Sequence, residues 1–473
     1  MRDTKVYLVL QNLSNRERGK FSRFIQSPYF NKNEPLVRLF ELIHRDLSSS
    51  QKKSFDKELV WRQFQINQPY DDVRFRKYLS DLLKNLENFL ALQVFESNEF
   101  QKSNFLLEAI LDRKMENLYT TIKKNTHSVA ERSAMKNADY YLYQYQSNKL
   151  LHDLETDNEQ KKKISTNFSE LSRMLDIFYF SEKLKLNYDA EVWKRIDGNL
   201  DADVSYIDEI TQFIQDAPVS NAPALSMYFS MHLLNKYPDK DKHYFDFKHQ
   251  LNSNIQFFPS HEAIPIYTAG INHCIRKINT GDSSFLEELF LLYKGYLKSL
   301  VEDSGQLSQW TFNNAITVAL RLGHYDWVKQ CIGEFGPSIT EKHRENAVTY
   351  NTASYHFYQE NYEEVIAVLR NIEYEDIYYN LNSKTMLLMT YYETDEFDPL
   401  HFLLESFRAY LNRNKTIPES KKINYKNFIK ITKKLANLPP SKSGVVEKLK
   451  KEINDTKQVS SRKWLLEKIE EFE

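Results

Sequence analysis

Glycine is scarce in this chain, with 10 residues among 473, or about 2%, where the average usage is ~7%. Doubly wound α/β folds and β-barrels need many tight turns and close backbone approaches, which glycine supplies. The scarcity therefore disfavours both, whereas arrays of helices need few glycines. Apolar residues make up 41% and aromatic residues 14% of the sequence, which is ample for a core. The composition favours an all-α protein.

Cysteine is even rarer, and the two residues, Cys274 and Cys331, are 57 positions apart. This spacing suits neither a disulfide framework nor a metal site, and it is typical of a reducing cytoplasm. The apolar run of residues 6–10 is too short for a signal peptide, and no run approaches the ~18 apolar residues of a membrane span. The chain has 64 basic and 65 acidic residues, so its net charge is close to zero and gives no overall attraction to a membrane or to nucleic acid. We expect a soluble, cytoplasmic protein with no membrane partner.

Motifs for catalysis are also missing. The closest glycines are three residues apart, so neither phosphate-binding pattern, G-x-G-x-x-G or Walker A, occurs, and G-x-S-x-G is absent. The 12 histidines show no H-E-x-x-H spacing. His273 and Cys274 are adjacent, but neighbours on a helix point in different directions, so we expect a buried, unreactive cysteine. The sequence predicts no enzyme, no cofactor and no metal site. A helical enzyme with a pocket built from distant residues remains an alternative.

Helical patterns run through the whole chain and favour four regions. An S-x-x-E capping box at Ser14 and Glu17 opens one of the first helices. A long helix follows residue 70, with a predicted buried stripe that begins at Val73. The predicted regions are an N-terminal helical domain at 1–100, irregular helical hairpins at 101–260, repeats at 261–410 and basic capping helices at 411–473, where Ser461 is expected to cap the last helix.

A repeated pattern appears in the third region. "LGHYDWV", "QENYEEV" and "TDEFDPL" each place an aromatic residue after a polar turn, at Tyr325, Tyr362 and Phe397, with spacings of 37 and 35 residues. The positions three, seven and ten residues after each aromatic are all apolar, which places them with it on one helical face. These nine positions are Val328, Ile332, Phe335, Val365, Leu369, Ile372, Leu400, Leu404 and Phe407. A weaker copy begins at Phe285, with Glu288 at one apolar position.

A period of 34 to 40 residues with two helices per unit resembles the tetratricopeptide repeat. The resemblance is good over 307–410, weak over 262–306 and only architectural upstream. It implies an α-solenoid, a right-handed superhelical array of antiparallel helix pairs, here preceded by an N-terminal helical bundle. The units are degenerate, because Ile316 and Leu388 stand where the family has a small residue, which only Ala353 provides. The first hundred residues also resemble those of bacterial helical-repeat proteins, and this similarity supplies no function.

The resemblance also implies a binding surface, because the first helix of each unit lines the concave face of a solenoid. That face is aromatic and amide-bearing and carries a single arginine, so capture of an acidic C-terminus is disfavoured. We predict a non-catalytic scaffold or adaptor that binds a peptide or helix of an unidentified protein partner. The predicted contact residues are Trp310, Asn313, Thr317, Arg321, Tyr350, Ser354, Tyr358, Asn382, Thr385 and Tyr392.

The alternative is a regulator that associates with nucleic acid. Residues 411–451 hold twelve basic and two acidic side chains, and "VRFRKY" at 73–78 adds an N-terminal basic patch. Lysines interleaved with aromatics can bind phosphates and stack bases. However, residues 360–398 hold ten acidic and two basic side chains, so neighbouring units could instead complement each other in charge. The candidate lysines are Lys421, Lys422, Lys426, Lys430, Lys433 and Lys434.

Overall fold

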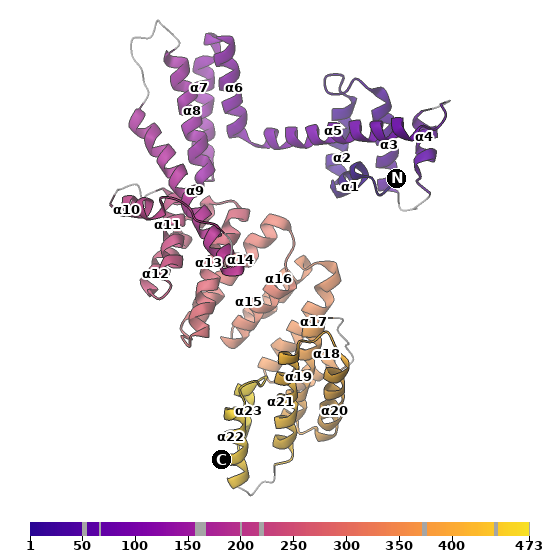
Figure 1. Cartoon of the computed structure of the whole chain (residues 1–473), viewed down its shortest axis with the longest axis vertical. Coiled ribbons are helices and arrows are strands. Elements are labelled where there is room, and N and C mark those ends of the chain that lie inside the picture. Colours follow the sequence, from indigo (N-terminus) through magenta and orange to yellow (C-terminus); the bar gives the residue numbers. More distant parts are fainter. Residues whose placement is uncertain are drawn as a thin grey trace. The chain divides into compact units, whose positions relative to one another are not determined.

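A computed structural model describes residues 1–49, 54–65, 68–156, 167–198, 201–216, 222–370, 376–438 and 443–472. The regular structure in these ranges is helical, with 23 α-helices and one isolated parallel bridge between Leu307 and Ile339. Consecutive helices pack against each other along the chain (Figure 1). This confirms the all-α prediction and is compatible with a helical repeat. The chain divides into two compact units, Met1–Phe180 and Ser181–Glu473.

The first unit begins with a bundle of five helices around one hydrophobic core. The core is rich in aromatic rings; for example, Phe21 lies edge-on to Phe40 with centroids 5.0 Å apart. The predicted capping box is present, since the Ser14 hydroxyl accepts from the Glu17 N–H and the Glu17 carboxylate accepts from the Ser14 N–H. The helices are α1 (Lys5–Asn12), α2 (Asn15–Gln26), α3 (Glu34–Ser48), α4 (Lys57–Phe64) and α5 (Asp72–Ser97).

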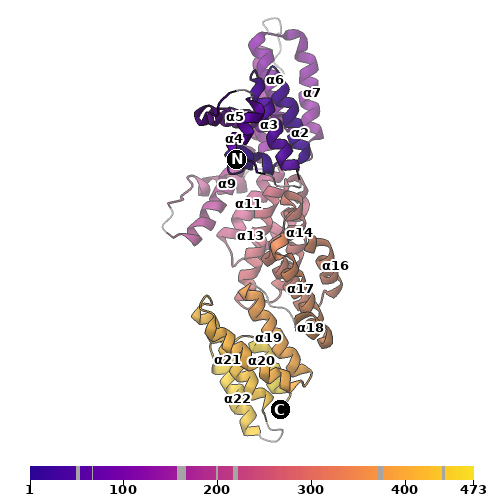
Figure 2. The same ribbon diagram turned by 90° about the vertical axis from the view of Figure 1, so that its right-hand side faces the viewer.

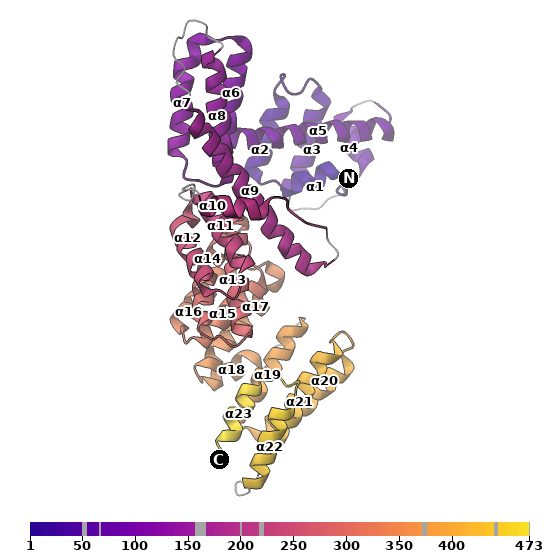
Figure 3. The ribbon, with the colours of Figure 1, turned by 60° about the vertical axis from the view of Figure 1, so that its left-hand side comes forward.

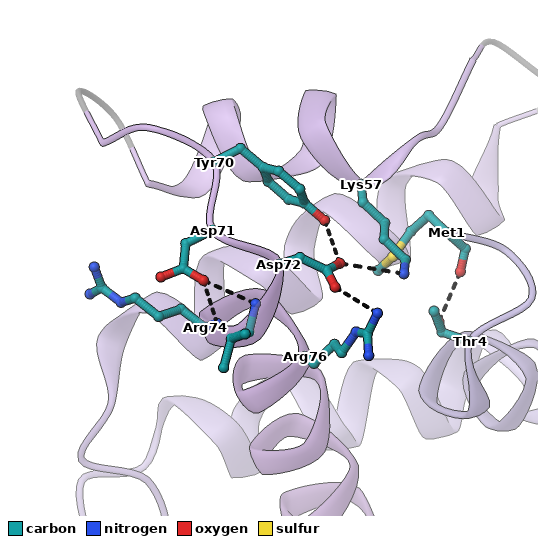
Figure 4. Close-up of polar contacts among 9 residues, drawn as sticks. Met1, Thr4, Lys57, Tyr70, Asp71, Asp72, Arg74 and Arg76 are labelled. Atoms are coloured by element: carbon teal, nitrogen blue, oxygen red, sulfur yellow. Dashed lines mark hydrogen bonds and ion pairs between the residues drawn. The ribbon is translucent and has the colours of Figure 1, made fainter.

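The start of α5 is fixed by two aspartates (Figure 4). The Asp71 carboxylate caps the helix by accepting from the backbone N–H groups of Val73 and Arg74. In this first turn Val73 points to solvent with 78% of its surface exposed, so its predicted place in the buried stripe is wrong. Phe75 is buried instead, against the ring of Trp61 at 6.1 Å.

The rest of the first unit is a second group of helices with its own small core around Leu107, Ile110, Ile122 and Leu151. A buried carboxylate links the second and third helices of this group. Glu155 accepts from the Tyr119 hydroxyl and from the Lys123 ammonium, both at 2.6 Å. The helices are α6 (Glu99–Arg113), α7 (Tyr119–Arg132), α8 (Ala138–Thr156) and α9 (Phe168–Ile196), the last of which continues into the second unit.

The second unit is a succession of helix pairs. Within each pair the two helices pack together, and each first helix also packs on the first helix of a neighbouring pair, as in α15, α17 and α19. Figure 2 shows α16 and α18 beside α17. The helices are α10 (Ile207–Asp216), α11 (Pro223–Lys236), α12 (Asp241–Asn254), α13 (Ser260–Asn279), α14 (Phe285–Ser304), α15 (Gln309–Arg321), α16 (Tyr325–Phe335), α17 (Glu341–Tyr358), α18 (Tyr362–Leu369), α19 (Ile377–Glu393) and α20 (Phe397–Arg413).

The repeated aromatics are the first residues of their helices. α16 begins at Tyr325, α18 at Tyr362 and α20 at Phe397. Three residues later on each helix, an apolar side chain is completely buried. Among the other predicted positions, Leu369, Leu404 and Phe407 are buried, Ile332 and Phe335 are half-buried, and Ile372 lies outside the described residues. The repeat pattern therefore marks a real periodic feature of the fold.

The turns before these helices are also alike. The residue two positions before each aromatic has a left-handed backbone: Gly323 (φ 77°), Glu360 (φ 61°) and Asp395 (φ 56°). In each turn the following N–H donates five residues back, from His324 to Ala319, from Asn361 to His356 and from Glu396 to Tyr391. Left-handed residues with such bonds satisfy the last carbonyls of a helix. The same turn is thus built three times, only once with glycine.

Glu288 in the weaker copy is accommodated by polar partners. Its carboxylate accepts from the Tyr244 hydroxyl at 2.9 Å and pairs with the Lys248 ammonium at 2.6 Å, both from α12. A partly buried carboxylate needs such partners. Glu288 therefore links α14 to α12 through polar contacts, at a position where the other copies of the repeat have an apolar residue.

Three helices, α21 (Glu419–Ala436), α22 (Ser443–Asp455) and α23 (Arg462–Glu470), end the chain and pack on one another (Figure 3). Leu465 and Ile469 of α23 are fully buried, as its apolar face predicts. Ser461 occupies the N-cap position, but its side chain makes no capping bond and its φ is 51°. The predicted Ser461 cap is therefore wrong, because a left-handed residue cannot direct its hydroxyl at the first turn as an extended one does.

Candidate functional site

Four aromatic rings from three first helices meet in one cluster, which we call the aromatic face. Trp310 of α15 stacks on Tyr379 of α19, with centroids 5.6 Å apart and planes 9° from parallel. Trp310 also meets Tyr378 edge-on at 5.5 Å, and Tyr350 of α17 lies 5.2 Å from Tyr379. Two of the predicted contact residues, Trp310 and Tyr350, are thus brought together. They are joined by Tyr378 and Tyr379.

The aromatic face is open at two of its members. Trp310 is 40% exposed and Tyr378 is 42% exposed, whereas Tyr379 is buried beneath them. The Lys421 ammonium of α21 lies 3.9 Å from the centroid of the Tyr378 ring. An ammonium at this distance is attracted by the face of the ring. The surface therefore combines two open aromatic rings with one cation.

A second group of predicted residues lies at the ends of α15 and α17. The Tyr325 hydroxyl donates to the backbone carbonyl of Tyr358 at 2.9 Å. Burial raises the pKa of the Tyr358 hydroxyl, and the nearby Arg321 opposes this shift. Tyr358 is still 40% exposed and Arg321 is exposed. Both side chains are therefore accessible.

Four of the predicted residues are small polar side chains. The hydroxyls of Thr317, Ser354 and Thr385 each donate to the backbone carbonyl four residues back in the same helix. Ser354 and Thr385 are buried, while Thr317 is exposed. Asn313 is half-buried, and its side-chain oxygen is buried without a hydrogen-bond partner among the described residues. Of the four, only Thr317 is exposed to solvent.

The last two predicted residues are engaged by the C-terminal helices. The Tyr425 hydroxyl of α21 donates to the Asn382 side-chain oxygen at 3.1 Å. The ring of Tyr392 meets Trp464 of α23 edge-on at 5.3 Å. The sequence pattern did not signal these contacts, because they join residues far apart in the chain.

The candidate nucleic-acid lysines are largely paired inside the unit. Lys430 and Lys434 both contact Glu452, at 2.9 and 2.5 Å. Lys433 pairs with Glu405 at 2.6 Å and Lys422 with Glu419 at 3.3 Å. Lys421 lies over Tyr378, and Lys426 lines a groove of about 560 Å³ between α20 and α21. Because four of the six charges have carboxylate partners, this segment attracts phosphate less than its composition suggests.

The N-terminal basic patch shows the same internal pairing (Figure 4). Asp72 accepts from the Tyr70 hydroxyl at 2.8 Å and pairs with Arg76 at 2.6 Å. The guanidinium of Arg74 lies 6.0 Å from the centroid of the Trp61 ring. Both arginines thus help to hold the start of α5.

The buried cysteines and their neighbours have pKa values that match an apolar environment. Burial raises the pKa of Cys274 and of Cys331 to about 12, so both thiols stay protonated at neutral pH. His273 stacks on Tyr244 at 5.2 Å, and burial lowers its pKa to about 4. Burial thus disfavours the negative thiolate of each cysteine and the positive imidazolium of His273.

Two further features, a metal site and a membrane-spanning helix, are absent from the parts of the chain that the structure describes. No group of three or more His, Cys, Asp or Glu side chains is placed to hold a metal ion. No described helix is both long enough and apolar enough to cross a bilayer.

Comparison with protein families, with curated proteins and with solved structures gives no match to this chain. The aromatic face therefore has to be interpreted from its own chemistry.

Proposed function

We propose that this chain is a non-catalytic scaffold or adaptor that binds a peptide or helix of a partner protein on the aromatic face. The observation that carries the proposal is the open pair Trp310 and Tyr378, held in place by the buried Tyr379. Exposed, rigid aromatic rings are the commonest anchors of protein interfaces. A scaffold of packed helices supports them, so they lose little conformational entropy on binding.

We also propose a specific arrangement of the helices in this scaffold. We infer a tetratricopeptide-like solenoid with antiparallel pairs and a right-handed superhelix. The support is the turn built alike at Gly323, Glu360 and Asp395, together with an aromatic residue at the start of each second helix. In such an array the first helices line the concave face, where α15, α17 and α19 bear the aromatic face.

The expected ligand is a segment with apolar or aromatic side chains and an acidic group. The rings of Trp310 and Tyr378 would cover the apolar part, and Lys421 beside Tyr378 would attract the acid. Helical or extended segments with spaced apolar anchors are recognised in this way. Arg321 and Tyr358, both exposed, extend the same chemistry along α15 and α17.

The test is affinity purification of the tagged protein from its own cells, with and without nuclease, followed by mass spectrometry. We expect a protein partner that survives nuclease and is lost in the double variant Trp310→Ala/Tyr378→Ala. The matched control is Phe402→Ala on α20, because Phe402 is 78% exposed and lies outside the aromatic face. Equal loss in the control, or full binding by the double variant, would contradict the proposal.

The nucleic-acid alternative is tested in the same experiment. Partners that disappear with nuclease, and binding that weakens steeply with salt, would favour it. In that case Lys426→Gln should weaken binding more than Trp310→Ala, because Lys426 is one of the candidate lysines for which no ion pair is present among the described residues.

A further inference from the structure

A separate pocket of about 330 Å³ lies among α9, α11 and α13, within the second unit. It uses none of the helices that carry the aromatic face. Its walls combine cationic, amide and apolar side chains, and a carboxylate is absent from the residues that line it. A pocket of this volume has room for a small organic molecule.

Two arginines face this pocket without a countercharge. Arg195 comes from α9 and Arg276 from α13, and neither forms an ion pair with any residue in the described ranges. Arg195 donates to the side-chain oxygen of Asn235 at 2.5 Å, which holds the guanidinium at the rim. Asp239 influences Arg276 only at longer range, since no ion pair joins them. Arg195 is exposed and Arg276 is half-buried, so both remain accessible to a ligand, and without an ion-paired carboxylate their like charges repel.

Tyr188, Arg195 and Arg276 line the same pocket, and their pKa shifts agree with this placement. The pKa of Arg276 is lowered, first by burial and then by Arg195. Burial raises the pKa of Tyr188; both arginines oppose this shift, and Asp189 adds to it. Asn272, exposed at the rim, adds an amide donor.

Apolar side chains form another part of the pocket wall and include Val192, Met231, Leu234 and Ala269. We propose that this pocket binds a small organic anion, in which a carboxylate or phosphate group meets Arg195 and Arg276 while an apolar body rests on this wall. An arginine fork donates two parallel hydrogen bonds to either group. A bound anion would offset the repulsion between the two guanidiniums.

The experiment is calorimetric titration of the full chain with phenylacetate and with phenyl phosphate. Phenylacetamide is the uncharged probe and inorganic phosphate the probe without an apolar body. We expect the organic anions to bind at least tenfold more tightly than either comparison probe. Tighter phenyl phosphate binding assigns a phosphate ligand, and tighter phenylacetate binding assigns a carboxylate; both support the site. Equal binding of phenylacetamide or of inorganic phosphate would overturn the proposal, as would no binding of either organic anion at millimolar concentration.

The variants follow from the same geometry. Arg195→Gln/Arg276→Gln should weaken binding of the organic anion by tenfold or more, because hydrogen bonds to charged groups are lost. Lys194→Gln is the control, since Lys194 is adjacent in sequence but pairs with Asp203 at 2.5 Å. A second variant, Asn272→Asp, places a negative charge at the exposed rim and should abolish binding without affecting folding.

A thermal readout separates a ligand site from a structural role. Without ligand, Arg276→Gln should melt at the same or a higher temperature than the wild type, because a repulsive charge is removed. The organic anion should raise the melting temperature of the wild type and leave that of the variant unchanged. A variant that melts lower and still responds to the anion would contradict the site.

Discussion

The hydroxyl of Tyr325, at the start of α16, donates a hydrogen bond to the backbone carbonyl of Tyr358, at the end of α17, over 2.9 Å. The bond joins the second helix of one pair to the first helix of the next. A C-terminal carbonyl of a helix lacks a partner within that helix, so Tyr325 satisfies a group that the fold leaves open. In this copy of the repeat, Tyr325 therefore contributes a hydrogen bond as well as its aromatic ring.

The variant Tyr325→Phe should therefore lower the free energy of unfolding by about 0.5–1.5 kcal/mol, the usual net value of one hydrogen bond. Urea denaturation measures the change. The matched control is Tyr358→Phe, which removes the hydroxyl of the accepting residue but leaves its backbone carbonyl intact. If the two variants lose stability equally, the bond does not contribute as the geometry indicates.

The left-handed turns predict stabilising substitutions. Glu360 and Asp395 have φ values of 61° and 56°, where a side chain costs about 1–2 kcal/mol relative to its preferred conformation. Glycine has no such cost, although it loses more entropy on folding. We expect Glu360→Gly and Asp395→Gly each to raise the free energy of unfolding by about 0.5–1 kcal/mol.

The third turn provides the reverse experiment. Gly323 has the same conformation, with φ 77° and open space where a Cβ would be placed. Gly323→Ala should destabilise by about 1 kcal/mol through the backbone alone. A neutral Gly323→Ala together with neutral glycine variants would contradict the prediction, because it would show that a side chain costs little in any of the three left-handed turns.

The sequence predicted the periodic part of the fold well, because that part depends on local pattern. The starts of α16, α18 and α20 follow from an aromatic residue after a polar turn and from apolar positions on one face. Val73 was placed wrongly for a related reason: the stripe of a helix can shift in its first turn, where Asp71 caps the backbone. Local pattern alone did not show that Phe75 would pack on Trp61.

The candidate sites were less predictable, because they depend on distances between helices. The stacking of Trp310 on Tyr379 joins two helices that are separated by a whole repeat. The convergence of Arg195 and Arg276 joins α9 to α13, and neither arginine belongs to a recognisable motif. The repeat register also includes residues that face inward, such as Ser354 and Thr385, which are buried. The spacing of apolar residues shows which face of a helix is packed, but it does not show which polar side chains on that face are exposed to solvent.

Gly270 in α13 and Gly295 in α14 lie in closely packed surroundings. We predict that neither can be replaced by alanine without a loss of stability. A Cβ on Gly270 would lie 2.9 Å from the Phe247 ring and 3.0 Å from Leu292. A Cβ on Gly295 would overlap the ring of Tyr267. Overfilling a packed interior costs about 1–3 kcal/mol, so Gly270→Ala and Gly295→Ala should each lower the free energy of unfolding by about that amount.

The control for this prediction is Gly333→Ala in α16. Gly333 is exposed, and among the described residues no atom outside its own stretch of helix backbone lies within 4 Å of the position of a Cβ. Alanine is favoured over glycine in a helix by about 1 kcal/mol, so this variant should be slightly more stable than the wild type in urea. Stabilisation by all three alanines would mean that α13 and α14 are less tightly packed than the structure indicates.

Two buried histidines predict a loss of stability in acid. Burial lowers the pKa of His232 and of His273 to about 4, below the ordinary value of ~6.5 that we assign to the unfolded chain. Between these pH values the unfolded state binds more protons than the folded state, so stability rises with pH. The stabilisation is complete above about pH 6.5 and is lost as the pH falls towards about 4. Each histidine should contribute at most about 3 kcal/mol.

His273→Phe separates this effect from general acid denaturation. Phenylalanine keeps a flat ring next to Tyr244, on which His273 now stacks at 5.2 Å, but it cannot be protonated. Urea denaturation of the wild type and the variant at pH 7.5 and pH 5 should show a smaller acid loss for the variant. His249→Gln on α12 is the control, because His249 is exposed and its replacement should leave the pH dependence unchanged. An equal acid loss in His273→Phe and in the wild type would place the titrating group elsewhere, because a group contributes to the slope only when its pKa differs between the folded and the unfolded chain.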